Sequence, residues 1–155
     1  MSELRFTQTN SALSMTCRIE TTIRAPADIV WRLLTDAQGF PRWNSTVSAI
    51  DGEIRDGERI RIHAPGTKLT FTPMISGVEP QRRMVWSDGV EPIFRGARRF
   101  ELEPDGADAT RFVMEERFSG VMFALARSMM PDFRPIFEAY ANDLKREAER
   151  IALAG

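Results

Sequence analysis

Six short runs of β-prone residues follow one another over positions 47–118, and a tight-turn signal separates each run from the next. The turn signals carry glycine or proline, as in Asp56-Gly57, Asp88-Gly89 and Asp105-Gly106. Connections of this length leave no room for the crossover that parallel strands need, so the pattern predicts an antiparallel meander. The six runs cover residues 47–50, 59–64, 69–78, 83–87, 94–103 and 111–118.

The segments on either side of the meander complete the predicted fold. Residues 17–23 alternate between inward and outward positions as a half-buried strand does, and two short helices are expected between Pro26 and Asn44. After the meander, an amphipathic helix is predicted from Pro131-Asp132 to about Leu153. The order of elements is therefore strand, two short helices, meander and long helix.

The last helix is the only predicted element long enough to cover one face of the sheet. Its apolar stripe includes Phe133, Phe137 and Tyr140, and lies opposite a face with Asp143 and Glu149 that we expect in solvent. The fold class is α+β, with a curved antiparallel sheet of about seven strands around the C-terminal helix.

The length of 155 residues suits a single domain with one core. We expect this domain to span residues 15–155 and the polar residues 1–14 to form a flexible lead, within which Arg5-Phe6-Thr7 is a weak candidate for an edge strand. Residues 121–130 are unusually apolar for a loop, which suggests a lid or a dimer surface.

The composition removes several classes of function. One histidine and one cysteine, Cys17, make a Cys/His metal cluster or a histidine-based triad hard to build, and we expect no metal and no cofactor. The net charge of −1 gives no electrostatic basis for binding nucleic acid. The chain shows neither a spanning apolar stretch nor a signal-peptide pattern, so we expect a cytoplasmic protein without membrane insertion.

Several short motifs, in this order and spacing, resemble the polyketide cyclase/START-related (SRPBCC) superfamily of helix-grip proteins. The resemblance covers about residues 15–153 and is specific for the fold, while the activities within the superfamily range from lipid carriers to cyclases and chaperone activators. The motifs are Ala25-Pro26, Val30-Trp31, Leu34-Thr35-Asp36, Phe40-Pro41, Trp43-Asn44, Phe71-x-Pro73, Met84-x-Trp86, Gly96-x-Arg98-x-Phe100-x-Leu102, Thr110-Arg111-Phe112 and Glu116-Arg117-Phe118-Ser119-Gly120.

The resemblance implies a largely apolar cavity between the sheet and the last helix. Alternation along the strands supplies a set of inward side chains that would either line this cavity or fill a solid core. The candidate ligand-binding residues are Ile62, Phe71, Pro73, Trp86, Phe94, Arg98, Phe100, Met114, Glu116, Phe133, Phe137 and Tyr140.

Two charged residues interrupt the inward apolar face. Arg98 is in register with Phe100 on one strand, and Glu116 is in register with Met114 on the next. A hairpin that turns at Asp105-Gly106 would place Arg98 opposite Glu116, and pairing is the only inexpensive way to bury these charges. The pair is either an internal salt bridge or a ligand-binding group, in which Arg98 donates to a carbonyl, carboxylate or phenolate.

Three functions remain open. The first is binding of a small hydrophobic ligand, such as an aromatic, lipid or polyketide-like molecule, without turnover. The second is a cyclase or dehydratase that uses Glu116, Tyr140 and Arg98 as its candidate catalytic groups. The third is a protein-interaction module of the chaperone-activator type, and a homodimer is an alternative use of the apolar 121–130 segment.

Overall fold

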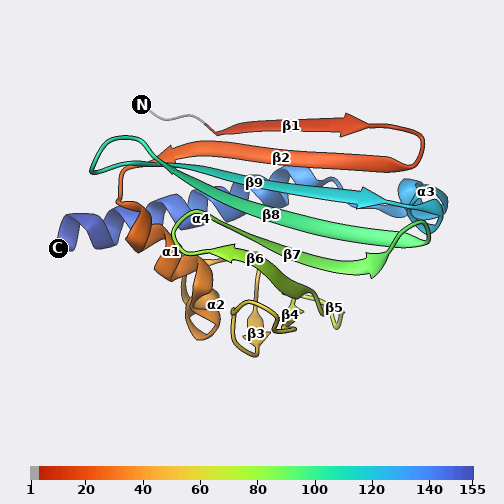
Figure 1. Ribbon diagram of the computed structural model, residues 1–155, viewed down its shortest axis with the longest axis horizontal. Helices are drawn as coiled ribbons and strands as arrows, with labels where there is room; N and C mark the ends of the chain where they lie inside the picture. The colour runs from red at the N-terminus through yellow and green to blue at the C-terminus, as the bar shows by residue number, and fades with distance from the viewer. Residues whose placement is uncertain (1–3) are drawn as a thin grey trace.

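The computed structural model describes residues 4–155, and its main feature is a six-stranded antiparallel sheet in the order β1-β2-β9-β8-β7-β6. The long C-terminal helix runs behind this sheet, and two short helices lie at one end of it (Figure 1). The six strands are β1 (Arg5–Asn10), β2 (Ser14–Ile23), β9 (Thr110–Ser119), β8 (Phe94–Pro104), β7 (Arg83–Val90) and β6 (Met74–Glu79).

Three further strands form a separate small sheet, so the main sheet has six strands where about seven were expected. The small sheet contains β3 (Ala49–Asp51), β4 (Arg61–His63) and β5 (Thr70–Phe71). The expected run 69–78 divides between the two sheets, as β5 and β6. The break falls at Thr72-Pro73, where the proline has no N–H to donate to a strand ladder.

The two short helices and the long C-terminal helix match the predicted order, whereas residues 121–129, expected as a loop, form a helix and a 3-10 turn. They are α1 (Ala27–Thr35), a 3-10 turn η1 (Ala37–Gly39), α2 (Phe40–Trp43), α3 (Val121–Ala126), a second 3-10 turn η2 (Arg127–Met129) and α4 (Phe133–Ala154). Asp132 begins α4 as its N-cap, because its side chain accepts a hydrogen bond from the Arg134 backbone N–H at 3.1 Å. Within residues 4–155, no helix has both the length and the apolar character needed to cross a bilayer.

The N-terminal segment differs from the expected flexible lead. Residues Arg5–Asn10 form β1, which pairs with β2 along its whole length from Arg5 opposite Glu20 to Asn10 opposite Met15. The Phe6 ring contacts the Phe137 ring of α4 edge to face at 5.8 Å, and this apolar contact holds the edge strand in place. The weaker expectation of an edge strand at Arg5-Phe6-Thr7 is therefore the correct one; residues 1–3 lie outside the described part of the chain.

The predicted apolar stripe of α4 faces the sheet, and Phe137, Tyr140 and Leu144 are buried. Its opposite face is less exposed than we expected. Asp143 is only 8% exposed, because its carboxylate accepts hydrogen bonds from the backbone N–H (2.8 Å) and the hydroxyl (2.6 Å) of Ser45. These bonds fasten α4 to the segment that follows α2, so the solvent position predicted for Asp143 is wrong.

Candidate functional site

The predicted hairpin register between β8 and β9 is confirmed. Leu102 lies opposite Phe112, Phe100 opposite Met114, and Arg98 opposite Glu116. On the flanking strands, Trp86 pairs with Arg98 and Cys17 pairs with Glu116. One row across the sheet therefore reads Cys17, Glu116, Arg98 and Trp86, with two charged residues between two buried ones.

The Arg98–Glu116 pair lies between the sheet and α4. Arg98 Nε donates to Glu116 Oε1 at 2.6 Å, and the two side chains are 21% and 16% exposed. The guanidinium carbon lies 5.3 Å from the centre of the Phe137 ring and 5.5 Å from the centre of the Tyr140 ring. Both rings stabilise the cation through their negative faces. The pair is thus held by aromatic residues of the helix and by one hydrogen bond across the hairpin.

The environment of Arg98 keeps it charged. Burial acts to lower its pKa, but the carboxylate of Glu116 and the Tyr140 hydroxyl together outweigh burial and raise the pKa above the usual arginine value. Among residues 4–155, Nε is the only guanidinium nitrogen with a hydrogen bond of good geometry, and the neighbouring Tyr140 hydroxyl interacts with the guanidinium more weakly. The two terminal nitrogens therefore remain available as donors, on a side chain that is partly reached by solvent.

Tyr140 adds a second polar group beside Arg98. It is 1% exposed, and its hydroxyl has no hydrogen-bond partner of good geometry within residues 4–155. Burial raises the pKa of this phenol, although the neighbouring Arg98 acts to lower it. Tyr140 is therefore protonated at neutral pH and can donate a hydrogen bond, and it cannot act as a base under these conditions.

Cys17 lies at the end of this row, next to Glu116. It is fully buried, and its pKa is raised to about 11, first by burial and then by the charge of Glu116. A protonated thiol in this position acts as a small apolar core side chain. Its place beside Glu116 depends on the pairing of β2 with β9, for which the local sequence carries no signal.

The candidate ligand-binding residues occupy three kinds of position. Pro73, Trp86, Phe100, Met114, Phe137 and Tyr140 are buried, and Ile62, Phe94, Phe133, Arg98 and Glu116 are partly buried. Phe71 is 56% exposed, so its predicted inward orientation is wrong. It belongs to the two-residue strand β5 at the edge of the small sheet, and the break at Pro73 interrupts the alternation that linked Phe71 to Ile75.

The end of the interior next to α2 is packed with aromatic rings. Trp86 lies 4.8 Å from Phe100, and Tyr140 lies 6.1 Å from Phe100, 6.2 Å from Trp43 and 6.4 Å from Phe40, measured between ring centres. The sequence gives no indication that Trp43 contacts Tyr140. The contact becomes visible only once α2 is placed against α4.

The other end of the interior is more open. Phe94 begins β8 and Phe133 begins α4, and both are only partly buried. These two starts lie toward α3, away from the C-terminus of α4 (Figure 1). Arg98 follows Phe94 by four residues on β8, so it lies deeper in the interior, and Glu116 lies opposite it on β9. Solvent still reaches part of each side chain. The candidate site is therefore the α3 end of the interface between the sheet and α4, where side chains are least tightly enclosed.

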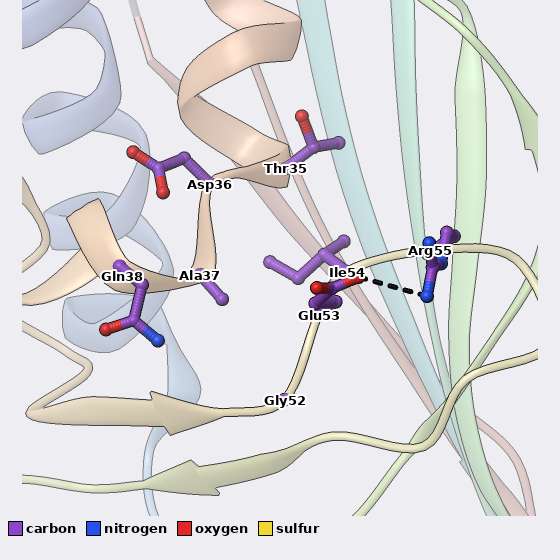
Figure 2. Close-up of a pocket in the computed structure, with 8 residues that line it drawn as sticks. All are labelled: Thr35, Asp36, Ala37, Gln38, Gly52, Glu53, Ile54 and Arg55. Carbon is purple, nitrogen blue, oxygen red and sulfur yellow. Dashed lines mark ion pairs between the residues drawn. The ribbon is translucent and has the colours of Figure 1, made fainter.

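Two surface hollows lie outside this space. Figure 2 shows one of about 360 Å³ between residues 35–38 and 52–55, where Glu53 and Arg55 form an ion pair at 3.0 Å. Both of these side chains are about two-thirds exposed or more, so the hollow has no buried polar group to select a ligand. The second, of about 480 Å³, lies between the start of α1 and the end of α4. Neither is lined by Arg98 or Glu116.

Comparisons with known proteins agree with the architecture. Residues 15–149 match the sequence family described as polyketide cyclase/dehydrase and lipid transport. The Zhui aromatase/cyclase from Streptomyces sp. R1128 is similar over 92% of this chain and 98% of its own, with a TM-score of 0.73 and 20% identity. A START superfamily protein from Mycobacterium smegmatis is similar over 88% of this chain and 98% of its own, with a TM-score of 0.64 and 13% identity.

CalU16 from Micromonospora echinospora is similar over 99% of this chain and 92% of its own, with a TM-score of 0.60 and 20% identity. Among curated proteins, no sequence matches this chain. At these identities the structural likeness shows a shared helix-grip fold, which confirms the fold class predicted from the motifs.

Proposed function

The chain belongs to the polyketide cyclase/dehydrase and lipid transport family, and from this premise we propose that it binds a small hydrophobic molecule between the main sheet and α4. The polar end of the ligand is held by Arg98. Met114 and Phe137 border its apolar body, Trp86, Phe100 and Tyr140 close its inner end, and Phe94 and Phe133 lie at its outer end. Ile62 and Pro73 extend this wall on the side of the small sheet.

The observation that carries the proposal is a charged arginine with unused donors in an aromatic environment. Within residues 4–155, Arg98 has one hydrogen bond of good geometry, from Nε to Glu116, and its two terminal nitrogens have only the neighbouring Tyr140 hydroxyl as a weak partner. A fork of two N–H groups matches a carbonyl, carboxylate or phenolate oxygen. Glu116 supports this role because it fixes the guanidinium through Nε and leaves the fork free.

The entrance also favours an apolar ligand. Phe133 lies 5.1 Å from Phe118 and 6.2 Å from Phe137, measured between ring centres. The ring therefore packs on the core on one side and is partly exposed to solvent on the other. A ligand that inserts beside these rings removes apolar surface from water, which is worth roughly 25 cal/mol per Å² before the costs of binding. Arginine then selects, among apolar molecules, those with an oxygen at one end.

A pair of fluorescent dyes tests the proposal. Anilinonaphthalene sulfonate is apolar with an anionic end, and phenylnaphthylamine lacks the anion. We expect Arg98→Gln to weaken binding of the sulfonate about tenfold, which corresponds to the loss of one charge-assisted hydrogen bond, and to change binding of the neutral dye little. Arg99→Gln is the matched control, because Arg99 is the next residue on β8, is 49% exposed and pairs with Glu101 and Glu115.

Equal loss of both dyes in Arg98→Gln, or no loss of either, would contradict the role of Arg98. Absence of saturable binding of both dyes to the unaltered protein would contradict ligand binding itself.

A cyclase or dehydratase is the second candidate, and the unpartnered Tyr140 hydroxyl favours it. The hydroxyl is protonated and lies beside Arg98, so both groups can donate to the oxygen of a ketone as negative charge develops on it. Glu116 is then the candidate for proton transfer. Turnover of a linear polyketone should fall by at least about a hundredfold in Tyr140→Phe if this donor acts in the transition state; unchanged turnover in both Tyr140→Phe and Glu116→Gln would exclude this use of the site.

A further inference from the structure

Exposed aliphatic side chains gather at the end of the molecule that carries α3. We call this surface the tip patch; its members are Val90, Ile93, Val121, Met122, Leu125 and Met129, and each is more than half exposed. Leu13 adjoins the patch, because its carbonyl accepts the backbone N–H of Gly120 at 3.0 Å. Figure 1 shows the three contributing segments together: the turn before β2, the turn between β7 and β8, and α3.

Backbone hydrogen bonds make the tip patch one continuous surface. The Val121 N–H donates to Pro92 and the Met122 N–H donates to Ile93, both at 2.9 Å. These bonds join the start of α3 to the turn between β7 and β8. Residues far apart in the sequence therefore lie side by side. The exposed apolar side chains form one contiguous patch and are not isolated on the surface.

Buried contacts beneath the patch fix its conformation. Phe123 is 1% exposed and its ring stacks on Phe118, with 6.1 Å between ring centres. The guanidinium of Arg127 donates to the backbone carbonyls of Ser11 and Ser14, at 2.5 and 2.8 Å. A surface that is already ordered loses little conformational entropy when a partner covers it. The patch is therefore an ordered surface.

We infer that the tip patch is the interface of a homodimer, in which a second copy of this chain covers it through a twofold axis. Six aliphatic side chains, each more than half exposed, offer several hundred Å² of apolar surface, on the order of the 800 Å² that each partner of a standard interface buries. The apolar centre is typical of homodimers, whose interfaces are more apolar than transient ones.

The charges at the rim favour a second copy over a lipid surface. Arg117 is paired with Glu91 at 3.2 Å and Arg127 is engaged with backbone carbonyls. Arg95, opposite Gly89 and Ser119 at the same end, adds one further cation, and these are fewer basic groups than the clusters of about four to eight that attract anionic lipid headgroups. The patch itself has no tryptophan or tyrosine of the kind that anchors proteins at a membrane interface. A rim with both signs of charge is self-complementary across a twofold axis, and a net charge of −1 gives little repulsion between copies.

Sedimentation velocity over a wide range of protein concentration tests this inference. The unaltered protein should shift from monomer to dimer as concentration rises. Leu125→Glu should weaken the dimer by at least about tenfold, because the twofold axis would bring two carboxylates into an apolar interface. Leu69→Glu is the matched control: Leu69 is 65% exposed against 73% for Leu125, lies outside the patch, and should leave the dimer unchanged.

Three results would overturn the inference. They are a protein that stays monomeric at every concentration, a Leu125→Glu variant that dimerises as tightly as the unaltered protein, and a monomer that instead binds vesicles of neutral phosphatidylcholine through Leu125. Far-ultraviolet circular dichroism establishes that each variant is folded, which is expected because both side chains point into solvent.

Discussion

At the scale of single residues, the Arg98–Glu116 pair is the feature whose stability depends most strongly on one interaction. A guanidinium among the rings of Phe137 and Tyr140 is stable only while a carboxylate remains beside it, since an isolated buried charge costs several kcal/mol. The outward-facing arginines have a different role. Arg99, for example, bonds Glu101 and Glu115 on the solvent side of the sheet, where ion pairs contribute little.

Removal of the inner carboxylate should therefore destabilise the fold much more than removal of an outer one. We expect Glu116→Gln to lower the free energy of unfolding by about 2–3 kcal/mol, since Arg98 stays charged and loses its counter-charge. Glu101→Gln, on the outer face of the same hairpin, should change it by less than about 0.5 kcal/mol. Urea unfolding measures both. Equal effects would show that Arg98 is well solvated and does not depend on Glu116.

Residue-scale reasoning from the sequence was sound where both partners lay on one hairpin. The β8–β9 register followed from alternation and from the turn at Asp105-Gly106, and it placed Arg98 opposite Glu116. It failed at Asp143 and Phe71. The burial of Asp143 depends on Ser45, 98 positions away, and the exposure of Phe71 depends on which sheet its strand joins. Periodicity within one element contains neither kind of information.

At the scale of elements, α4 is fastened to the short helices by ionic contacts as well as by its apolar stripe. Glu147 on α4 accepts from Arg42 of α2 at 2.6 Å and from Arg150 on its own helix at 2.7 Å. The bond from Arg150, followed by that from Arg42, lowers the pKa of Glu147 to about 2, although burial acts in the opposite direction. Protonation of this carboxylate therefore loosens the contact between α2 and α4.

The sign of the resulting pH dependence follows from linkage. A carboxylate whose pKa is lower in the folded state than in the unfolded state stabilises the fold above about pH 4.5, and this contribution disappears as the pH falls toward about 2. We expect Glu147→Gln to lose about 1–2 kcal/mol relative to the unaltered protein at pH 7 and almost nothing at pH 2. Thermal unfolding at several pH values measures this difference. A difference that stays constant from pH 7 to pH 2 would contradict the assignment.

The fold class could be predicted from element-scale patterns, and the boundaries of some elements could not. Turn signals and the amphipathic stripe of α4 were sufficient for the antiparallel sheet and its covering helix. The strand β1 has a polar sequence with one anchoring ring, Phe6, so its order comes from the long edge of β2 rather than from its own pattern. The small sheet has strands of two or three residues, too short to show a period.

The whole molecule has two unlike ends. At one end the short helix α2 closes the interior, because Phe40 and Trp43 pack against Tyr140. At the other end, near α3, Phe94 and Phe133 are partly exposed and Arg98 is within reach of solvent. The same end carries the tip patch. A ligand would therefore enter beside the surface at which we place the second copy, and its apolar body would lie along the inner face of β8 and β9.

The methionines offer the most direct measurement of where a ligand binds. Met84 and Met114 are fully buried and pair with Phe100 from opposite sides, whereas Met129 is 84% exposed in the tip patch. In a protein with isotope-labelled methionine methyl groups, saturation with anilinonaphthalene sulfonate should shift the Met114 and Met84 signals and leave the Met129 signal in place. In Arg98→Gln these shifts should require a higher dye concentration. Shifts confined to Met129, or absent from both interior methionines, would contradict a ligand site between the sheet and α4.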